Sequence, residues 1–295
     1  MLIWLASNFS IIDTPSIPSN PGPHLDTEYN PLFDIDIVVS MYKEPIDHVE
    51  WGLKSIRKIP GFQTQRLFIY TKDENANIEA INDAMRPFKV IHVPNVGREG
   101  ETYLRHIVDH WDDLAKHTMF IQADIHNPRE FIPRVRDYFD AERTGMLSLG
   151  FPGNVCDCAN CGDRFGWHDD TGMVPSLYKK VYQTDEACNR DLLSYKGQFI
   201  ASARRIRGVK KEVYEDLWKA IRDPNSWAHE AKYLRGRRDE MSAPIFGYTL
   251  ERVWGLLMQC SDLEIAWKCP TLLSGKRRGG SKADCQCFDE TSNGT

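Results

Sequence analysis

The sequence predicts an α/β protein with a mainly parallel, doubly wound sheet and a helical C-terminal third. Two observations predict this class: short β-branched runs alternate with segments of helical periodicity, and the last third shows helical periodicity alone. Of the 295 residues, 41% are hydrophobic and 27% are charged, which is typical of a globular chain and not of a disordered or collagen-like one. No apolar run approaches the roughly 18 residues that a membrane span needs, so we expect no membrane partner.

The first part of the chain holds an arm, followed by alternating strands and helices. Residues 1–32 are rich in proline, which neither propagates a helix nor pairs in a central strand, so we expect an extended N-terminal arm. Residues 33–295 then form a single α/β catalytic domain with a cysteine-rich insertion at about 150–190. The first strands are predicted at 35–40, 66–71 and 89–93, and helices at 46–59 and 78–85.

The next unit has the clearest helical pattern. A turn-rich loop at 94–100 leads into a helix of about four turns from Glu101, whose apolar residues recur every three or four positions. A strand at 118–123 follows. Further along the chain, the periodicity predicts helices at 210–222 and 248–259. This alternation is typical of a Rossmann-like or glycosyltransferase-A-like sheet.

The topology predicts where a ligand binds. In doubly wound sheets, ligands sit beyond the carboxyl ends of the parallel strands. Glu44, the loop at 97–101, Asp124 and His126 each follow a predicted strand. We therefore expect these residues to converge on one rim, which is the candidate active site.

The start of the predicted helix carries residues that suit chemistry or packing. Glu99 and Glu101 lie where a helix favours negative charge, so they either stabilise the helix end or face a ligand. Tyr103, His106 and His110 share one flank, where polar rings serve either as hydrogen-bonded packing or as proton carriers. His106 is the best general acid–base on this helix, because imidazole titrates near neutral pH.

The tripeptide that follows the strand at 118–123 places two polar groups together. Asp124 and His126 are two residues apart, and nucleotide-sugar transferases with a related sheet hold a divalent cation with Asp-x-Asp at such a point. Here histidine replaces the second aspartate. The pair either binds Mn²⁺ or Mg²⁺ or has a structural role in which Asp124 caps the following turn.

Four cysteines have a spacing that suits a structural metal. Thiolates bind Zn²⁺ tetrahedrally, and three of these residues lie within six positions. Free thiols and disulfides are the alternatives, and a catalytic zinc is not expected because so many sulfurs would close the site. The predicted ligands are Cys156, Cys158, Cys161 and, as the fourth, Cys188, with His168 as the alternative fourth ligand.

The N-terminal residues and the cysteine content favour an intracellular location. The apolar stretch Met1–Ala6 ends after six residues and has no basic flank, so it lacks the form of a secretory signal. Eight unevenly spaced cysteines do not have the density of a disulfide-stapled small domain. We therefore expect a soluble cytoplasmic protein.

The net charge of −5 is an average over oppositely charged regions. Residues 195–238 hold twelve basic and five acidic residues (+7), and residues 268–282 hold five basic residues and no acidic one (+5), which leaves −17 for the rest. Such runs are usually solvated surface, but two of them favour a polyanionic partner. The candidate contacts are Arg204, Arg205, Arg207, Lys210, Lys211, Lys276, Arg277 and Arg278.

Short motifs between about residues 34 and 260 carry a family resemblance. They are Val38-Val39-Ser40 with Glu44 and Trp51; Asn95-x-Gly97-Arg98-Glu99-x-Glu101-Thr102-Tyr103-Leu104-x-His106-Ile107; Phe120-Ile121-Gln122; Gly197-Gln198-Phe199; and Leu250-Glu251-x-x-Trp254. Together they resemble a large fungal family long described only as a domain of unknown function. That group resembles the one containing the fungal arginine-containing cyclodipeptide synthases.

The resemblance implies a tRNA-dependent aminoacyltransferase of fungal secondary metabolism. Such an enzyme condenses arginine from Arg-tRNA with a second aminoacyl-tRNA to form a cyclo(Arg-Xaa) diketopiperazine. The esters already store the activation energy, so no cofactor is required for the chemistry, and the expected partners are the two charged tRNAs. The basic runs would hold tRNA phosphates, and carboxylates would hold the guanidinium group, which they pair with best.

The same resemblance assigns residues to this reaction. The catalytic candidates are Glu99, Tyr103, His106 and Asp124. The substrate-binding candidates are Glu44, Glu101, His126, Gln198 and Glu251. Two other functions remain open: a metal-dependent glycosyltransferase built on Asp124 and His126, and a non-catalytic, zinc-stabilised RNA-binding or scaffold protein.

Overall fold

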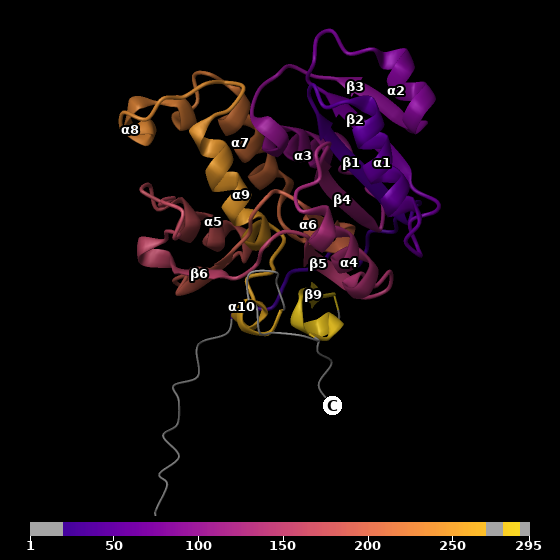
Figure 1. Ribbon diagram of the computed structural model, residues 1–295. Coiled ribbons are helices and arrows are strands. Elements are labelled where there is room, and N and C mark those ends of the chain that lie inside the picture. Colours follow the sequence, from indigo (N-terminus) through magenta and orange to yellow (C-terminus); the bar gives the residue numbers. More distant parts are fainter. Residues whose placement is uncertain (1–19, 270–279, 290–295) are drawn as a thin grey trace, which may run out of the picture.

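The central sheet has seven strands in the order β3-β2-β1-β4-β8-β5-β9 (Figure 1). The computed structural model describes residues 20–269 and 280–289. The strands are β1 (Ile35–Met41), β2 (Arg66–Thr71), β3 (Lys89–His92), β4 (His117–Gln122), β5 (Thr144–Ser148), β8 (Phe199–Ser202) and β9 (Gln286–Phe288). β1 pairs in parallel with β2 and β4, and β2 with β3, whereas β8 runs antiparallel to β4 and β5, and β9 antiparallel to β5. The predicted mainly parallel, doubly wound sheet is confirmed.

The first helices lie where the periodicity predicts them. They are α1 (Ile46–Arg57), α2 (Ile78–Met85) and α3 (Arg98–Asp109). α3 begins three residues earlier than predicted, because Gly97 adopts a left-handed conformation with φ +67° that turns the chain into the helix. It also ends earlier: Leu114 and Ala115 are buried, but they lie beyond the end of the helix.

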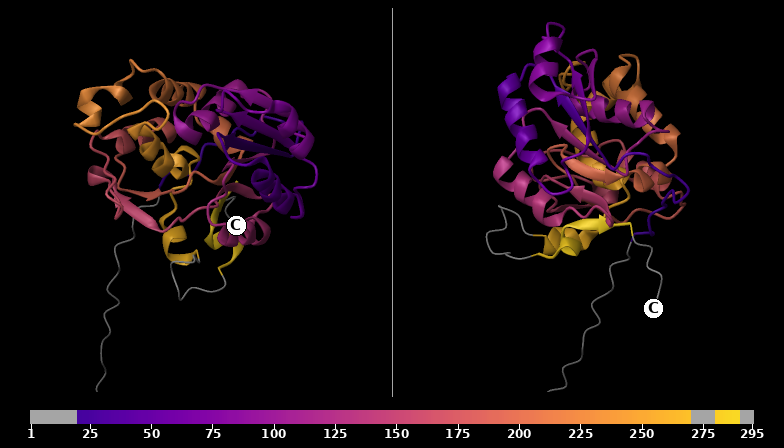
Figure 2. Two further views of the ribbon diagram at one scale, coloured as in Figure 1. Left: turned by 45° about the horizontal axis from the view of Figure 1, so that its top comes forward. Right: turned by 90° about the vertical axis from the view of Figure 1, so that its right-hand side faces the viewer.

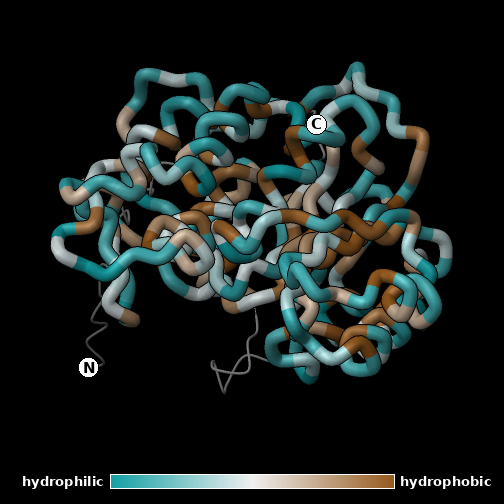
Figure 3. The backbone as a smooth tube through the Cα atoms, turned by 90° about the horizontal axis from the view of Figure 1, so that it is seen from above, coloured by the Kyte–Doolittle hydropathy of each residue, from teal (hydrophilic) through white to brown (hydrophobic). Residues whose placement is uncertain are grey.

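Helices cover both faces of the sheet (Figures 1 and 2). One face is covered by α1, α2 and α4 (Pro128–Tyr138), and the other by α3, α7 (Lys211–Arg222) and α9 (Ile245–Leu257). Strand residues alternate between the faces, so Val38 and Phe120 belong to the core on the α3 side, whereas Val39 and Ile121 belong to the core on the α1 side. In Figure 3 many of the hydrophobic segments run through the interior of the molecule, and hydrophilic segments predominate around them.

The insertion and the C-terminal third contain more regular structure than predicted. The additional elements are the strands β6 (Asn154–Asp157) and β7 (Arg190–Leu193), the helices α5 (Met173–Val181), α6 (Ala203–Gly208), α8 (Ala231–Leu234) and α10 (Leu263–Lys268), and the 3-10 turns η1 (Cys158–Asn160), η2 (Trp227–His229) and η3 (Lys282–Asp284). β6 and β7 form a separate antiparallel pair. None of the helices in the described ranges is long and apolar enough to cross a membrane.

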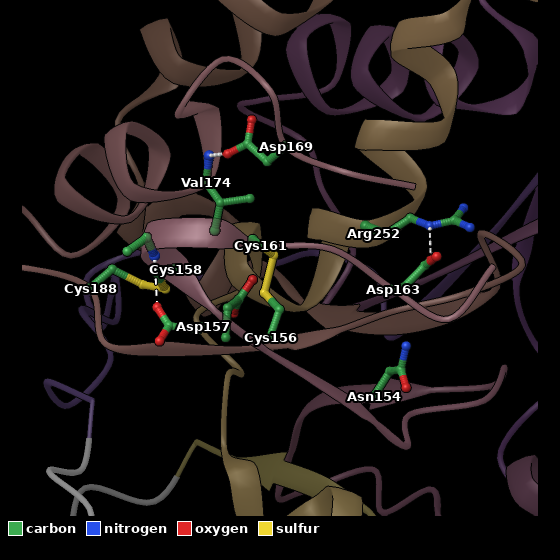
Figure 4. The surroundings of a disulfide bond; sticks show 12 residues. Asn154, Cys156, Asp157, Cys158, Cys161, Asp163, Asp169, Val174, Cys188 and Arg252 are labelled. Carbon is green, nitrogen blue, oxygen red and sulfur yellow. Dashed lines mark hydrogen bonds and ion pairs between the residues drawn. A yellow bond between two sulfur atoms is a disulfide. The ribbon is translucent and has the colours of Figure 1, made fainter. Parts of the chain in front are cut away.

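The four cysteines of the insertion form two disulfides, Cys156–Cys161 and Cys158–Cys188 (Figure 4). The predicted zinc site at these residues is therefore wrong, because a sulfur bonded to another sulfur offers no thiolate to a metal. Spacing could not separate the two outcomes. The ladder of β6 and β7 brings the chain segments together, and close cysteines suit a disulfide or a metal equally well.

The remaining cysteines attach the C-terminal strand to the domain. Cys260 bonds to Cys287 and Cys269 to Cys285, so β9 is linked to the segment that contains α10. All eight cysteines of the chain are thus paired. This contradicts the expectation that the cysteine content argues against disulfides.

Candidate active site at the carboxyl rim of the sheet

The sheet order places a switch point between β1 and β4. From β1 the chain continues to β2 and β3 on one side, and from β4 it continues to β5 on the other. Such a point leaves a crevice beyond the carboxyl ends of the two strands. Two pockets open there, both lined by residues of the β1–α1 segment and of the segment 124–130 after β4.

The smaller of these pockets, here called the acidic pocket, has a volume of about 350 Å³ and is lined by Glu44, Pro45, Asp47, His48 and Asp124. His48 Nε2 lies 3.1 Å from Asp124 Oδ1. The carboxylate of Glu44 accepts a hydrogen bond from the backbone N–H of Tyr42 (2.6 Å). The predicted convergence of Glu44 and Asp124 is therefore confirmed.

The acidic pocket offers limited ligands for a metal ion. Across residues 20–269 and 280–289, no three His, Cys, Asp or Glu side chains are grouped so that they could hold one. His48 and Asp124 together supply two ligands. Mg²⁺ is often bound by one or two carboxylates together with substrate phosphates, so a divalent cation fits here only when the substrate supplies the remaining ligands.

Glu99 lies beside this crevice, in the first turn of α3, with 12% of its side chain exposed. Burial raises the pKa of its carboxyl group. Arg98, whose Nε lies 3.8 Å away, and a hydrogen bond with Gln122 oppose this shift, whereas the charge of Glu251 adds to it. A carboxyl group with a raised pKa at a strand-end crevice suits general acid–base catalysis.

The segment before β8 closes over Glu99. Lys196 (φ +71°) and Gly197 (φ +54°) are both left-handed, and a Cβ atom on Gly197 would approach Glu99 Oε1 to 3.2 Å. The backbone N–H of Lys196 donates to Glu251 Oε1 at 2.7 Å. This carboxylate therefore holds the strained turn that covers Glu99.

Gln198, a predicted substrate contact, has a structural role. Its side-chain oxygen accepts from the backbone N–H of His126 (2.8 Å), and its side-chain nitrogen donates to the backbone carbonyl of His126 (3.3 Å). Gln198 is buried, and it fixes the loop after β4 as a strand partner would. The side chain of His126 is exposed.

The larger pocket, here called the aromatic pocket, has a volume of about 850 Å³. Four aromatic rings and five charged side chains line it, together with Asn127 and Pro128. They are Trp51, Phe151, Phe165 and Tyr195, and Arg129, Glu130, Lys196, Glu251 and Arg252. His48 of the acidic pocket and Trp51 lie three residues apart on α1, so the two pockets adjoin along one face of that helix.

Glu101 does not reach the rim. It is fully buried, its carboxylate lies 2.7 Å from Arg105 and 3.2 Å from Lys72, and it accepts a hydrogen bond from Trp218 Nε1. The four groups form a paired network around the buried carboxylate. This placement argues against a role for Glu101 in substrate binding.

Tyr103 and His106 also lie in the core. Tyr103 packs against Phe120 and Trp254, with ring centroids 5.1 and 5.9 Å away. His106 Nδ1 is 3.0 Å from the hydroxyl of Tyr70, and burial holds the pKa of its ring well below the usual value, so it is neutral. Its nearest carboxylate, Asp36 at 3.9 Å, belongs to the amino end of β1. His106 therefore lies at the opposite end of the strands from the crevice, a placement that argues against a catalytic role.

Two cations of the predicted basic surface, Arg205 and Arg207, are engaged in internal contacts. Arg205 is buried, pairs with Asp289 at 2.8 Å and donates to three backbone carbonyls. Arg207 pairs with Asp26 at 2.8 Å. Arg204 and Lys210 are exposed, and Lys211 lies 3.8 Å from Glu215. The cations at 276–278 lie outside the described residues.

Several residues at the rim were hard to predict from the sequence. His48 lies four residues after Glu44, and this spacing at the start of a helix was the available signal. Gln122 and Trp51 belong to the family-like motifs without an assigned role. Tyr195 comes from the segment between β7 and β8 and Arg252 from α9, and only the folded chain brings them to the same pocket.

Comparisons with known proteins find only partial or distant similarity. Residues 37–137 match the family described as "Protein of unknown function (DUF3431)". No curated protein matches the sequence. Two solved structures are similar at a low level. One is 4-diphosphocytidyl-2C-methyl-D-erythritol synthase (9% identity, TM-score 0.33, covering 74% of this chain and 96% of that one). The other is mouse xyloside xylosyltransferase 1 in its apo form (12% identity, TM-score 0.31, covering 73% and 81%).

Proposed function

We propose that this protein is a glycosyltransferase that moves a sugar from a nucleotide-activated donor to an acceptor at the crevice between β1 and β4. The observation that carries the proposal is the pair of adjoining pockets, since a group transfer needs one site for each substrate. Glu99 interacts with Gln122 at the end of β4 and with Glu251 in the aromatic pocket. Glu99 therefore lies near a carboxylate of the aromatic pocket and near the end of the strand that leads to Asp124.

In this proposal the acidic pocket receives the phosphates of the donor. Three carboxylates there, Glu44, Asp47 and Asp124, would repel phosphate unless a cation lies between them. His48 and Asp124 are the side chains that would hold a divalent cation, which would neutralise the charge on the phosphates. This requirement gives the proposal a direct test by chelation.

Glu99 is proposed to take up the proton of the acceptor. The acceptor hydroxyl oxygen forms a bond to the anomeric carbon, the bond from that carbon to the phosphate oxygen breaks, and the nucleotide diphosphate leaves with the electron pair. The acceptor proton passes to the carboxylate of Glu99. Its raised pKa makes Glu99 a stronger base than an exposed glutamate.

The disulfides favour this reaction over one that consumes charged tRNA. Disulfides persist in oxidising compartments and are rare in the cytosol, where aminoacyl-tRNAs are made and used. All eight cysteines are paired here, so we infer that the chain works in an oxidising compartment and not in the cytoplasm. The internal pairing of Arg205 and Arg207 further reduces the surface available to tRNA.

The arginine-containing cyclodipeptide synthase is the second candidate. The observation that favours it is the presence of Glu130 and Glu251 among aromatic rings, since a guanidinium group binds carboxylates and stacks on rings. Under this function, purified protein given Arg-tRNA and a second charged tRNA yields a cyclo-Arg product, detected by mass spectrometry.

Donor binding tests the first candidate. Calorimetry with UDP, GDP and CDP, each with Mn²⁺ and again with a chelator, should show binding of one nucleotide that is lost on chelation. Asp124→Asn should weaken that binding about tenfold or more, because it removes one of two cation ligands. Glu142→Gln, a change at an exposed carboxylate that pairs with Lys116, is the matched control and should have no effect.

Two results would overturn the proposal. One is the absence of binding to all three nucleotides by protein whose fold and four disulfides are verified. The other is formation of cyclo-Arg products from charged tRNAs, a result that would establish the second candidate instead.

A further inference from the structure

The aromatic pocket contains large aromatic side chains that are exposed to solvent, which is energetically unfavourable for them. Trp51 and Phe165 expose 56% and 58% of their surface, and both line this pocket. Phe151 and Tyr195 contribute two further rings, 5.8 Å apart between centroids. Exposed rings gathered around a concave surface are typical of ligand sites, because a bound ring covers them.

The pocket keeps an excess of positive charge after the ion pairs of its charged side chains are taken into account. Arg252 pairs with Glu251 at 2.9 Å and with buried Asp163 at 3.1 Å. Glu130 lies 3.9 Å from Arg134. The two carboxylates of the pocket are thus each near a cation, and Arg252 is fully engaged.

The other two positively charged side chains that line the pocket are those of Arg129 and Lys196. No hydrogen bond or ion pair joins either side chain to another residue in the described ranges. Lys196 also adopts a left-handed backbone conformation, which is costly for a residue other than glycine. Residues held in this way by their surroundings concentrate at functional sites, and here the backbone bond from Lys196 to Glu251 holds it.

The wall that carries Tyr195 and Phe165 is held by hydrogen bonds to Asp163, whose ion pair with Arg252 is drawn in Figure 4. The hydroxyl of Tyr195 donates to Asp163, which also accepts from Arg252 and from the backbone N–H groups of Phe165 and Trp167. The disulfide Cys156–Cys161 ends two residues before Asp163. The pocket is therefore largely formed before a ligand arrives, which lowers the entropy cost of binding.

We infer that the aromatic pocket binds a ligand with a flat or apolar-faced ring that carries a negatively charged group. The ring stacks among Trp51, Phe151 and Phe165, and the anionic group meets Arg129 and Lys196. The inference rests on the proposed function only in identifying this ligand as the acceptor. The pocket itself has the size of a small-molecule site.

Binding of simple probes tests the inference without any donor. Indole-3-acetate combines the ring with an anion, tryptamine combines the same ring with a cation, and agmatine carries a guanidinium group without a ring. Calorimetry on the full chain should show that indole-3-acetate binds about tenfold or more tightly than tryptamine, since two cations attract one probe and repel the other. Agmatine should not bind measurably.

Variants assign the binding to this pocket. Trp51→Ala should weaken indole-3-acetate about fivefold, as expected for the loss of one stacking ring, whereas Trp267→Ala, which removes a ring with the similar exposure of 54%, should have no effect. Arg129→Gln should weaken indole-3-acetate about threefold and leave tryptamine unchanged or improved.

Preferred binding of tryptamine or agmatine would overturn the inference and point to a cationic ligand. So would binding of indole-3-acetate that survives Trp51→Ala or falls equally in Trp267→Ala. Nucleotide binding by the same protein preparation separates the two proposals. If a nucleotide binds and indole-3-acetate does not, the inference fails while the proposed function stands.

Discussion

Asp191 provides a stability test that does not depend on the function. Its side chain is fully buried in β7; the hydroxyl of Ser261 donates to one carboxylate oxygen, and the other oxygen has no hydrogen-bond partner. Burial raises the pKa of this carboxyl group from 3.8 to about 7, although the hydrogen bond from Ser261 opposes the shift. Asp191 is therefore protonated in the folded protein under mildly acidic conditions and ionised in the unfolded chain.

The pKa shift sets the sign and size of the effect. Between about pH 4 and pH 7 the folded state holds a proton that the unfolded state has released, so the free energy of unfolding falls as the pH rises and levels off above about pH 7. A shift from 3.8 to about 7 corresponds to about 4 kcal/mol at 1.36 kcal/mol per pH unit. Asp191→Asn removes the ionisable group and keeps the shape, so the variant should match the wild type near pH 4 and exceed its stability by up to about 4 kcal/mol at pH 8.

Urea unfolding with intact disulfides, followed by circular dichroism at pH 4.5, 6 and 8, measures this difference. Asp216→Asn, a change at an exposed carboxylate on α7, is the matched control and should show less than about 0.5 kcal/mol at every pH. An Asp191→Asn variant that is less stable than the wild type at pH 8, or whose advantage does not grow with pH, would contradict a raised pKa for Asp191. The carboxylate would then be stabilised by its surroundings and not penalised by burial.

Four further outcomes follow from the site and the core. Glu99→Gln should lower turnover with the transferred sugar about a hundredfold or more at an unchanged melting temperature, since the amide cannot accept the proton; unchanged turnover would exclude Glu99 as the base. Gly197→Ala should lower the free energy of unfolding by about 1–2 kcal/mol, because position 197 has a positive φ. It should also lower turnover, because the new Cβ atom would lie 3.2 Å from Glu99. A denaturation curve and an activity assay that both match the wild type would contradict this. Glu101→Gln should destabilise the protein by about 3–5 kcal/mol in urea, because it leaves buried Lys72 and partly buried Arg105 without their counter-charge. A loss of activity without loss of stability would instead place Glu101 in the site. Thiol titration of the denatured protein should find no free thiols before reduction and eight afterwards. Reduction should lower the free energy of unfolding by about 2–5 kcal/mol per disulfide. Reactive thiols before reduction would contradict the pairing.

Much of the first half of the fold was accessible from the sequence. The runs Ile35–Met41 and Arg66–Thr71 are mostly hydrophobic because parallel strands are buried on both faces, and α2 has the bounds that its periodicity predicts. The second half was less predictable. β8 and β9 contain only four and three residues, and such short runs carry no periodicity that could separate a strand from a loop.

Some residues of the candidate site could be placed from the sequence, and others could not. Glu44 and Asp124 were placed at the rim correctly, because the carboxyl ends of neighbouring parallel strands must lie side by side. His106 was misplaced, because helical spacing puts it on the buried flank but does not say which end of the strands it faces. A count of charges along the sequence could not show that Arg205 is paired, because its partner Asp289 lies 84 residues away along the chain.

The alternation of strands and helices, and with it the rim on which ligands are expected, could be predicted from the sequence, since both follow from local periodicity and the handedness of parallel connections. Which charges stay unpaired depends on the tertiary structure. A carboxylate or guanidinium is available to a substrate when no buried partner neutralises it, and those partners come from distant parts of the chain, as Asp289 does for Arg205 and Lys72 for Glu101. The pairing of the cysteines also depends on tertiary contacts, because two cysteines must be close in space to form a disulfide. Sequence spacing alone could not distinguish four disulfides from a metal site.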